Sequence, residues 1–119
     1  MKQYTTPEQT AKLIELGVEK PKTIVDKYYD FDAEDYKEVK HYSIGELISF
    51  IPSVADWDGQ QWRFCMECHI SGGWTCFYIN ASKQWWTYDK DNAYIGIYNE
   101  ELIDALFSYI IILKEKRVI

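Results

Sequence analysis

Near the middle of the chain the apolar residues change from helical spacing to strict alternation. From position 62 to position 70 every second residue is apolar: Trp62, Phe64, Met66, Cys68 and Ile70. Alternation over this length predicts a half-buried β-strand, because successive side chains of a strand point to opposite faces. Gly72 and Gly73 follow, and they can supply the positive φ angles of a two-residue hairpin turn. The centre of the chain is therefore expected to form an antiparallel hairpin.

The return strand is expected over residues 74–80. With a two-residue turn, Thr75, Phe77 and Ile79 lie opposite the apolar set of the first strand. The other face of the return strand, taken as the outer one, carries Trp74, Cys76 and Tyr78. Further strands are expected over residues 84–89 and 93–98, and residues 53–60 have the composition of a turn.

Two helix starts precede the strands. Thr6 and Gln9 can form a capping box, and so can Ser43 and Glu46 ahead of a short helix over residues 44–51. A third helix follows the strands, with Asn99 as its expected cap and a broad apolar stripe over residues 102–113.

The order of these elements predicts the class of fold. Helix, helix, strands and helix favour one α+β domain over residues 1–119. We expect a three- or four-stranded antiparallel meander, with two N-terminal helices and one C-terminal helix packed on one of its faces.

Residues 18–42 have no clear period. Residues 23–29 favour a short strand, whereas residues 30–40 contain five acidic side chains and two lysines. Such a run is typical of a solvated loop or an exposed ribbon. The sequence leaves open whether this segment covers the outer face of the sheet.

Charge and composition narrow the class of partner and the compartment. Thirteen Lys and Arg residues against nineteen Asp and Glu residues give a net charge of -6, which argues against binding of nucleic acid as the main function. The longest apolar run is far below the roughly 20 residues of a membrane span. A polar N-terminal segment and an odd number of cysteines, three, favour the cytoplasm with reduced thiols.

The string from Cys65 to His69 contains the residue types of haem attachment, zinc binding or nucleophilic catalysis. On a strand, Cys65 and Cys68 point to opposite faces, which disfavours a closed zinc site. Only His69 and Cys76 are expected to meet, as cross-strand neighbours. The sequence therefore predicts no metal, no cofactor and no catalytic residue, with an enzyme that uses Cys76 and His69 as the third hypothesis.

The aromatic side chains on the expected outer face are the predicted binding residues. They are Trp74, Tyr78 and Trp85, and Tyr and Trp on an exposed sheet are typical of a contact surface for a protein or a stacked ligand. The equally weighted alternative is that residues 18–42 fold over this face and make it a second core.

Several blocks of the chain carry a resemblance. They are residues 8–9, 13–17, 42–48, 51–52, 102–107 and 113–115. Together they resemble small uncharacterised proteins that prophages and mobile elements of gut bacteria encode. The resemblance brings no known activity, ligand or catalytic residue. It implies an accessory protein that acts on a host or phage protein.

These observations favour a non-enzymatic accessory protein–protein interaction module. Its partner is an unknown protein or a second copy that associates through the aromatic sheet face, and neither a membrane nor nucleic acid is expected. The alternative hypothesis is a small-ligand binding protein that stacks a sugar or a base on Trp74 and Trp85.

Overall fold

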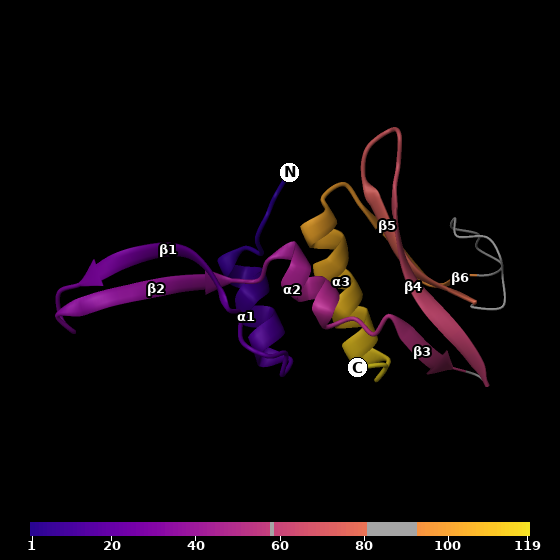
Figure 1. The fold of residues 1–119 in the computed structure, drawn as a ribbon, viewed down its shortest axis with the longest axis horizontal. Coiled ribbons are helices and arrows are strands. Elements are labelled where there is room, and N and C mark those ends of the chain that lie inside the picture. Colours follow the sequence, from indigo (N-terminus) through magenta and orange to yellow (C-terminus); the bar gives the residue numbers. More distant parts are fainter. Residues whose placement is uncertain (58, 81–92) are drawn as a thin grey trace.

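In the computed structural model, three helices lie between a two-stranded hairpin and a four-stranded antiparallel sheet (Figure 1). The structure describes residues 1–57, 59–80 and 93–119. The molecule measures 57 × 33 × 18 Å, and the hairpin and the sheet stand at opposite ends of its long axis. The α+β class expected from the sequence is confirmed.

The elements follow one another along the chain in a simple order. They are α1 (Pro7–Glu15), β1 (Thr23–Asp30), β2 (Asp35–His41), α2 (Ile44–Ser49), β3 (Val54–Trp57), β4 (Gln60–Cys68), β5 (Trp74–Asn80), β6 (Ala93–Asn99) and α3 (Leu102–Glu115). The sheet order is β3-β4-β5-β6, so each strand pairs with its neighbours in sequence. β6 confirms the strand expected at 93–98, whereas β3 occupies part of the expected turn. The strand expected over 84–89 lies outside the described residues.

Both N-terminal helices begin at the predicted capping boxes. The Thr6 hydroxyl accepts from the amide of Gln9, whose side chain accepts from the amide of Thr6, and Ser43 and Glu46 are paired in the same way. The last helix begins differently from the prediction. Its N-cap is Glu101, which makes no side-chain capping bond, and the Asn99 carboxamide oxygen instead accepts from the amide of Glu101 at 3.1 Å.

The hairpin of β4 and β5 has a longer connection than predicted. Cys68 pairs with Trp74, so five residues join the strands where a two-residue turn was expected. As a result Met66, and not His69, lies opposite Cys76, a displacement of three residues. A displacement by an odd number of residues moves every side chain of a strand to the other face of the sheet.

This register corrects the expected outer face. Cys76 and Tyr78 belong to the main core, and only 1% of Tyr78 is exposed. The Tyr78 ring lies 6.0 Å from the ring of Tyr109 on α3, and Trp74 is partly buried against the same core. The prediction that Trp74 and Tyr78 face away from the helices is therefore wrong, and Trp85 lies outside the described residues.

The core is organised around α3. This helix contacts β5 and β6 on one side and α1 and α2 on the other. Seven of its side chains are buried: Leu102, Ile103, Ala105, Leu106, Tyr109, Ile110 and Leu113. Residues 23–41 extend away from this core and from the sheet, so they do not cover the sheet (Figure 1).

Candidate functional site

The hairpin of β1 and β2 contributes no side chain to the core cluster. Its strands pair from Thr23 opposite His41 to Asp30 opposite Asp35, with an irregularity between Ile24 and Asp26. Most of its side chains are exposed on both faces, and it projects from the helices (Figure 1). An isolated two-stranded hairpin is marginally stable in water. Contacts at its base and at its turn must therefore hold it in place.

At the base, β2 is attached to α1 through a chain of hydroxyl groups. The Nδ1 atom of His41 lies 2.7 Å from the hydroxyl of Thr10, which lies 2.7 Å from the hydroxyl of Thr5. The amide of Tyr42 donates to that same Thr5 hydroxyl at 3.0 Å. Thr5 and Thr10 are buried, so these hydrogen bonds provide partners for hydroxyl groups that water cannot reach.

The start of β1 is attached to α2 through one carboxylate. Glu46 accepts hydrogen bonds from the hydroxyl of Thr23, from the amide of Lys22 at 2.8 Å and from the amide of Ser43 at 3.3 Å. Burial alone would raise the pKa of Glu46, but the hydrogen bonds from Thr23, Lys22 and Ser43 outweigh burial and lower this pKa below its ordinary value. The charged form of Glu46 therefore holds the hairpin to the helix.

At the far end, an Asx turn fixes the backbone. The Asp30 carboxylate accepts from the amides of Asp32 at 3.0 Å and Ala33 at 3.3 Å. Glu34 completes the turn with a φ of 51°, a left-handed conformation that few residues other than glycine adopt. The turn is thus defined by local bonds and does not depend on the core.

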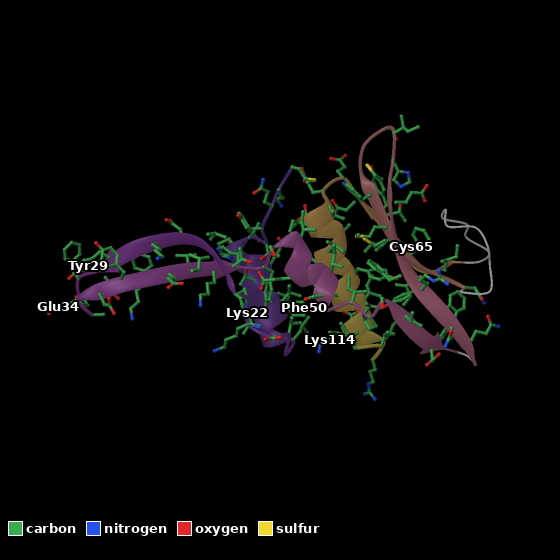
Figure 2. All side chains as sticks on the ribbon, in the orientation of Figure 1. Lys22, Tyr29, Glu34, Phe50, Cys65 and Lys114 are labelled. Carbon is green, nitrogen blue, oxygen red and sulfur yellow. The ribbon has the colours of Figure 1, made fainter. Side chains whose placement is uncertain are left out.

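Three aromatic rings pack together beside this turn, and we call them the tip cluster: Tyr29, Phe31 and Tyr36. The ring of Tyr29 lies 4.8 Å from that of Phe31 and 5.2 Å from that of Tyr36, both edge to face. These pairings are favourable geometries for aromatic rings. Even so, 83% of Phe31 and 69% of Tyr36 remain exposed. Figure 2 shows Tyr29 and Glu34 at the end of the molecule farthest from Cys65 of the sheet.

The turn beside the tip cluster is acidic, whereas Lys27 and Lys37 follow the cluster along the two strands. Residues 30–35 contain four acidic side chains and no basic one, namely Asp30, Asp32, Glu34 and Asp35. Apolar rings inside a negative field form a surface that favours a partner with an apolar pocket and positive charges around it.

The residues considered for catalysis are not brought together. Cys76 is buried, and desolvation raises its pKa to about 12, which disfavours the reactive thiolate. The Nε2 atom of His69 lies 2.6 Å from the hydroxyl of Thr75 instead of near Cys76. Within the described part of the chain, no three His, Cys, Asp or Glu side chains are grouped to hold a metal ion.

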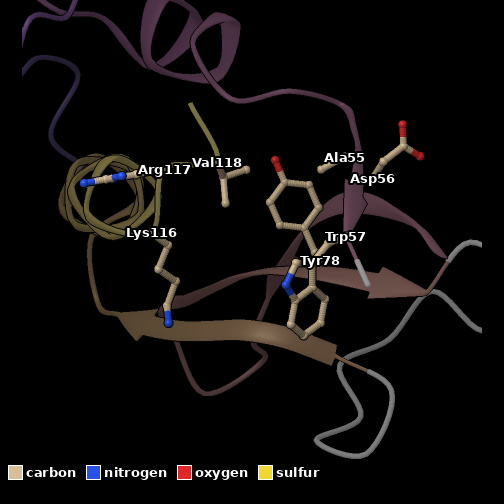
Figure 3. Close-up of a pocket in the computed structure, with 7 residues that line it drawn as sticks. All are labelled: Ala55, Asp56, Trp57, Tyr78, Lys116, Arg117 and Val118. Atoms are coloured by element: carbon tan, nitrogen blue, oxygen red, sulfur yellow. The ribbon is translucent and has the colours of Figure 1, made fainter. Parts of the chain in front are cut away.

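A cavity of about 200 Å³ lies between β3, β5 and the end of α3 (Figure 3). Its lining residues are Ala55, Asp56, Trp57, Tyr78, Lys116, Arg117 and Val118. The Tyr78 hydroxyl donates to the carbonyl oxygen of Pro52 at 2.7 Å, which fixes one wall. We call this site the α3-end cavity.

The sequence contained a signal for the tip cluster that the prediction did not use. The segment from Tyr28 to Phe31 places three aromatic residues within four positions, and Tyr36 follows at the pairing distance of a short hairpin. The surrounding acidic residues favoured a solvated loop, so these rings were not considered as binding residues.

No family model, no curated protein and no solved structure matches the chain. The resemblance to prophage and mobile-element proteins therefore stays a prediction. None of the helices in the described ranges is both long enough and apolar enough to cross a membrane.

Proposed function

We propose that this chain is a protein–protein interaction module and that the tip cluster of its hairpin is the contact surface. The observation that supports this function most directly is the exposure of Phe31 and Tyr36 on an arm that contributes little to the core. Scattered exposed apolar residues are common, but three large rings gathered at one end of a projecting hairpin are not needed for folding.

The physical basis of the proposal is the order already present at the tip. Aromatic side chains dominate the binding energy of many protein interfaces. Binding is weakened when loops and side chains must first be ordered, and each flexible side chain costs roughly 0.5–1.5 kcal/mol. Here the Asx turn at Asp30 and the edge-to-face contacts of Tyr29 hold the rings before any partner arrives.

The proposal keeps the accessory, non-enzymatic role expected from the sequence but moves the surface. Trp74 and Tyr78 contribute to the core, so their removal would affect folding before binding. The tip cluster can be changed with little effect on the core, which is what a dedicated contact surface requires.

The test is site-specific photo-cross-linking in cells that express the chain. A photoreactive benzophenone side chain replaces Phe31 in one variant and Ile70, a fully exposed residue of the β4–β5 loop, in a second. We expect discrete cross-linked adducts of higher mass from position 31 and none from position 70. Equal labelling from both positions, or adducts from position 70 alone, would contradict the proposal.

A further inference from the structure

We infer that the partner of the hairpin tip is a second copy of this chain, whose α3-end cavity receives Phe31. This inference rests on the proposed function, because it requires the tip cluster to be the contact surface. It adds the identity of the partner and the place on the partner where the tip docks.

The first argument is size. The α3-end cavity has a volume of about 200 Å³, and a cavity of roughly 150 Å³ is enough to hold one benzene ring. Phe31 is the most exposed ring of the tip cluster, so it can enter a cavity while Tyr29 and Tyr36 stay in contact with each other. One phenyl ring and this cavity are therefore matched in volume.

The second argument is the chemistry of the walls. Trp57 and Tyr78 provide aromatic surface, and Ala55 and Val118 provide aliphatic surface. The charged groups of the cavity are at its edges: Figure 3 shows the carboxylate of Asp56 and the guanidinium of Arg117 directed away from the Tyr78 ring. An apolar guest such as Phe31 would thus meet aromatic and aliphatic side chains beside the polar groups of the lining.

The third argument is charge complementarity between the tip and the cavity. Among the described residues that line the cavity, two are basic, Lys116 and Arg117 at the end of α3, and one is acidic, Asp56. The tip carries four acidic side chains and no basic one over residues 30–35. Opposite charges around an apolar contact favour encounter and orientation.

The geometry makes the association head-to-tail. The tip belongs to the β1–β2 hairpin, whereas the cavity lies between the sheet and the end of α3, so the two surfaces of a contact differ. Such heterologous contacts produce rings or open chains of subunits and not a two-fold dimer. A contact limited to a hairpin tip is also small, which places it among weak, transient interfaces.

The experiment is sedimentation equilibrium on two complementary variants. Phe31→Ala removes the ring but keeps the cavity, whereas Lys116→Glu/Arg117→Glu reverses the charge at the cavity but keeps the tip. All three side chains are exposed, so both variants should fold, and circular dichroism checks this. We expect the mass of the wild type to rise above 14.1 kDa with concentration at 0.15 M salt and each variant to stay at the monomer mass.

An equimolar mixture of the two variants gives the decisive result. Only one competent tip and one competent cavity remain, so the mixture should form a 1:1 complex and nothing larger. High salt (1 M) should weaken this complex, because the Debye length falls to about 3 Å. Adding Asp32→Lys/Glu34→Lys to the cavity variant changes the net charge of residues 30–35 from -4 to zero, so the complex with Phe31→Ala should weaken strongly.

Two results would overturn the inference. One is a wild-type chain that stays monomeric up to roughly 0.5 mM, where a Kd of 10⁻⁴ M would be visible. The other is a variant mixture that does not associate although the wild type does. Adducts from position 31 to other proteins, with a monomeric wild type, would leave the proposed function standing and end this inference alone.

Discussion

Some aromatic side chains are buried in the sheet of this molecule, whereas those of its hairpin are exposed. In the sheet, Phe64 and Tyr78 pack against Tyr109 of α3 and leave almost no Tyr78 surface exposed. In the hairpin, Tyr29 and Tyr36 pack against each other and stay open to solvent. Both regions are antiparallel strands with aromatic cross-strand contacts. The difference is the helix layer that covers one and not the other, so the aromatic content of a strand does not by itself show whether its rings serve the core or a contact.

The largest expected effect is the loss of a buried ring. Tyr78→Ala removes the contacts with Phe64 and Tyr109 and the hydrogen bond to Pro52. The free energy of unfolding should fall by about 3–5 kcal/mol, the usual cost of truncating a large core side chain. Chemical denaturation measures it. A loss below about 1 kcal/mol would remove the contrast between the two ends.

The second effect concerns the loop that sets the register of the sheet. Gly73 has a φ of 94°, and a Cβ there would overlap the hydroxyl oxygen and the ring of Tyr98. The Tyr98 side chain would have to move, which would break its 3.1 Å hydrogen bond to the carbonyl oxygen of Gly72. Gly73→Ala should cost roughly 1–3 kcal/mol in thermal or chemical unfolding.

The matched control is Gly72→Ala, because Gly72 has a similar φ of 99° but open space around its Cβ. The excess cost at Gly73 should disappear when Tyr98 is also replaced by alanine. An equal cost at both glycines in the wild-type background would show that Tyr98 does not hold the loop.

A smaller effect is expected at the base of the hairpin. Glu46→Gln removes the charged acceptor of the hydrogen bonds from Thr23 and Lys22. The free energy of opening the hairpin base should fall by about 1 kcal/mol, which hydrogen exchange detects as faster exchange of the β1 amides. The folded-state pKa of Glu46 lies below the unfolded value. Its stabilisation is therefore complete at pH values well above the unfolded-state pKa and is lost as the pH falls through the folded-state pKa.

The contribution of the Glu46 carboxylate is isolated by measuring the free energy of unfolding against pH for the wild type and for Glu46→Gln. The wild type should lose more stability than Glu46→Gln between neutral and acidic pH. Parallel curves would show that the carboxylate does not anchor the hairpin.

The smallest effect on stability should come from the tip. Phe31→Ala removes one edge-to-face contact at a position that is 83% exposed, so the change in unfolding free energy should stay within about 0.5 kcal/mol. Differential scanning calorimetry of Phe31→Ala and Tyr78→Ala under the same conditions measures this difference in stability. A loss as large as that of Tyr78→Ala would mean that the hairpin folds against something in the core.

Local signals in the sequence were enough to predict where the two N-terminal helices begin and where most strands lie. The capping boxes at Thr6 and Ser43 act within one turn of helix, so they could be recognised without knowledge of the rest of the chain. The register of β4 and β5 could not be predicted from local signals. Gly72 and Gly73 suit either a two-residue turn or the last part of a five-residue loop. With the five-residue loop, Tyr78 and Cys76 face α3 and pack in the core.

The candidate site was harder to predict for a related reason. Residues 23–29 were expected to form a strand, but the return strand carries Asp35, Lys37 and Glu38, whose charges suggest solvent. A ribbon that is exposed on both faces has no alternating pattern to find. What identifies it is the cross-strand contact of Tyr29 and Tyr36, which depends on the pairing itself.

The attachment of the hairpin at its base has a consequence for how such a protein can change over generations. Glu46, Thr10 and Thr5 hold the arm from outside the tip. The Asx turn forms between the Asp30 carboxylate and the backbone amides of Asp32 and Ala33. Substitutions at Phe31 or Tyr36 alter neither attachment. On the proposed function, selection can therefore change what the arm binds while the helices and the sheet stay the same. Related chains should then differ most in specificity at the tip, where stability imposes few constraints.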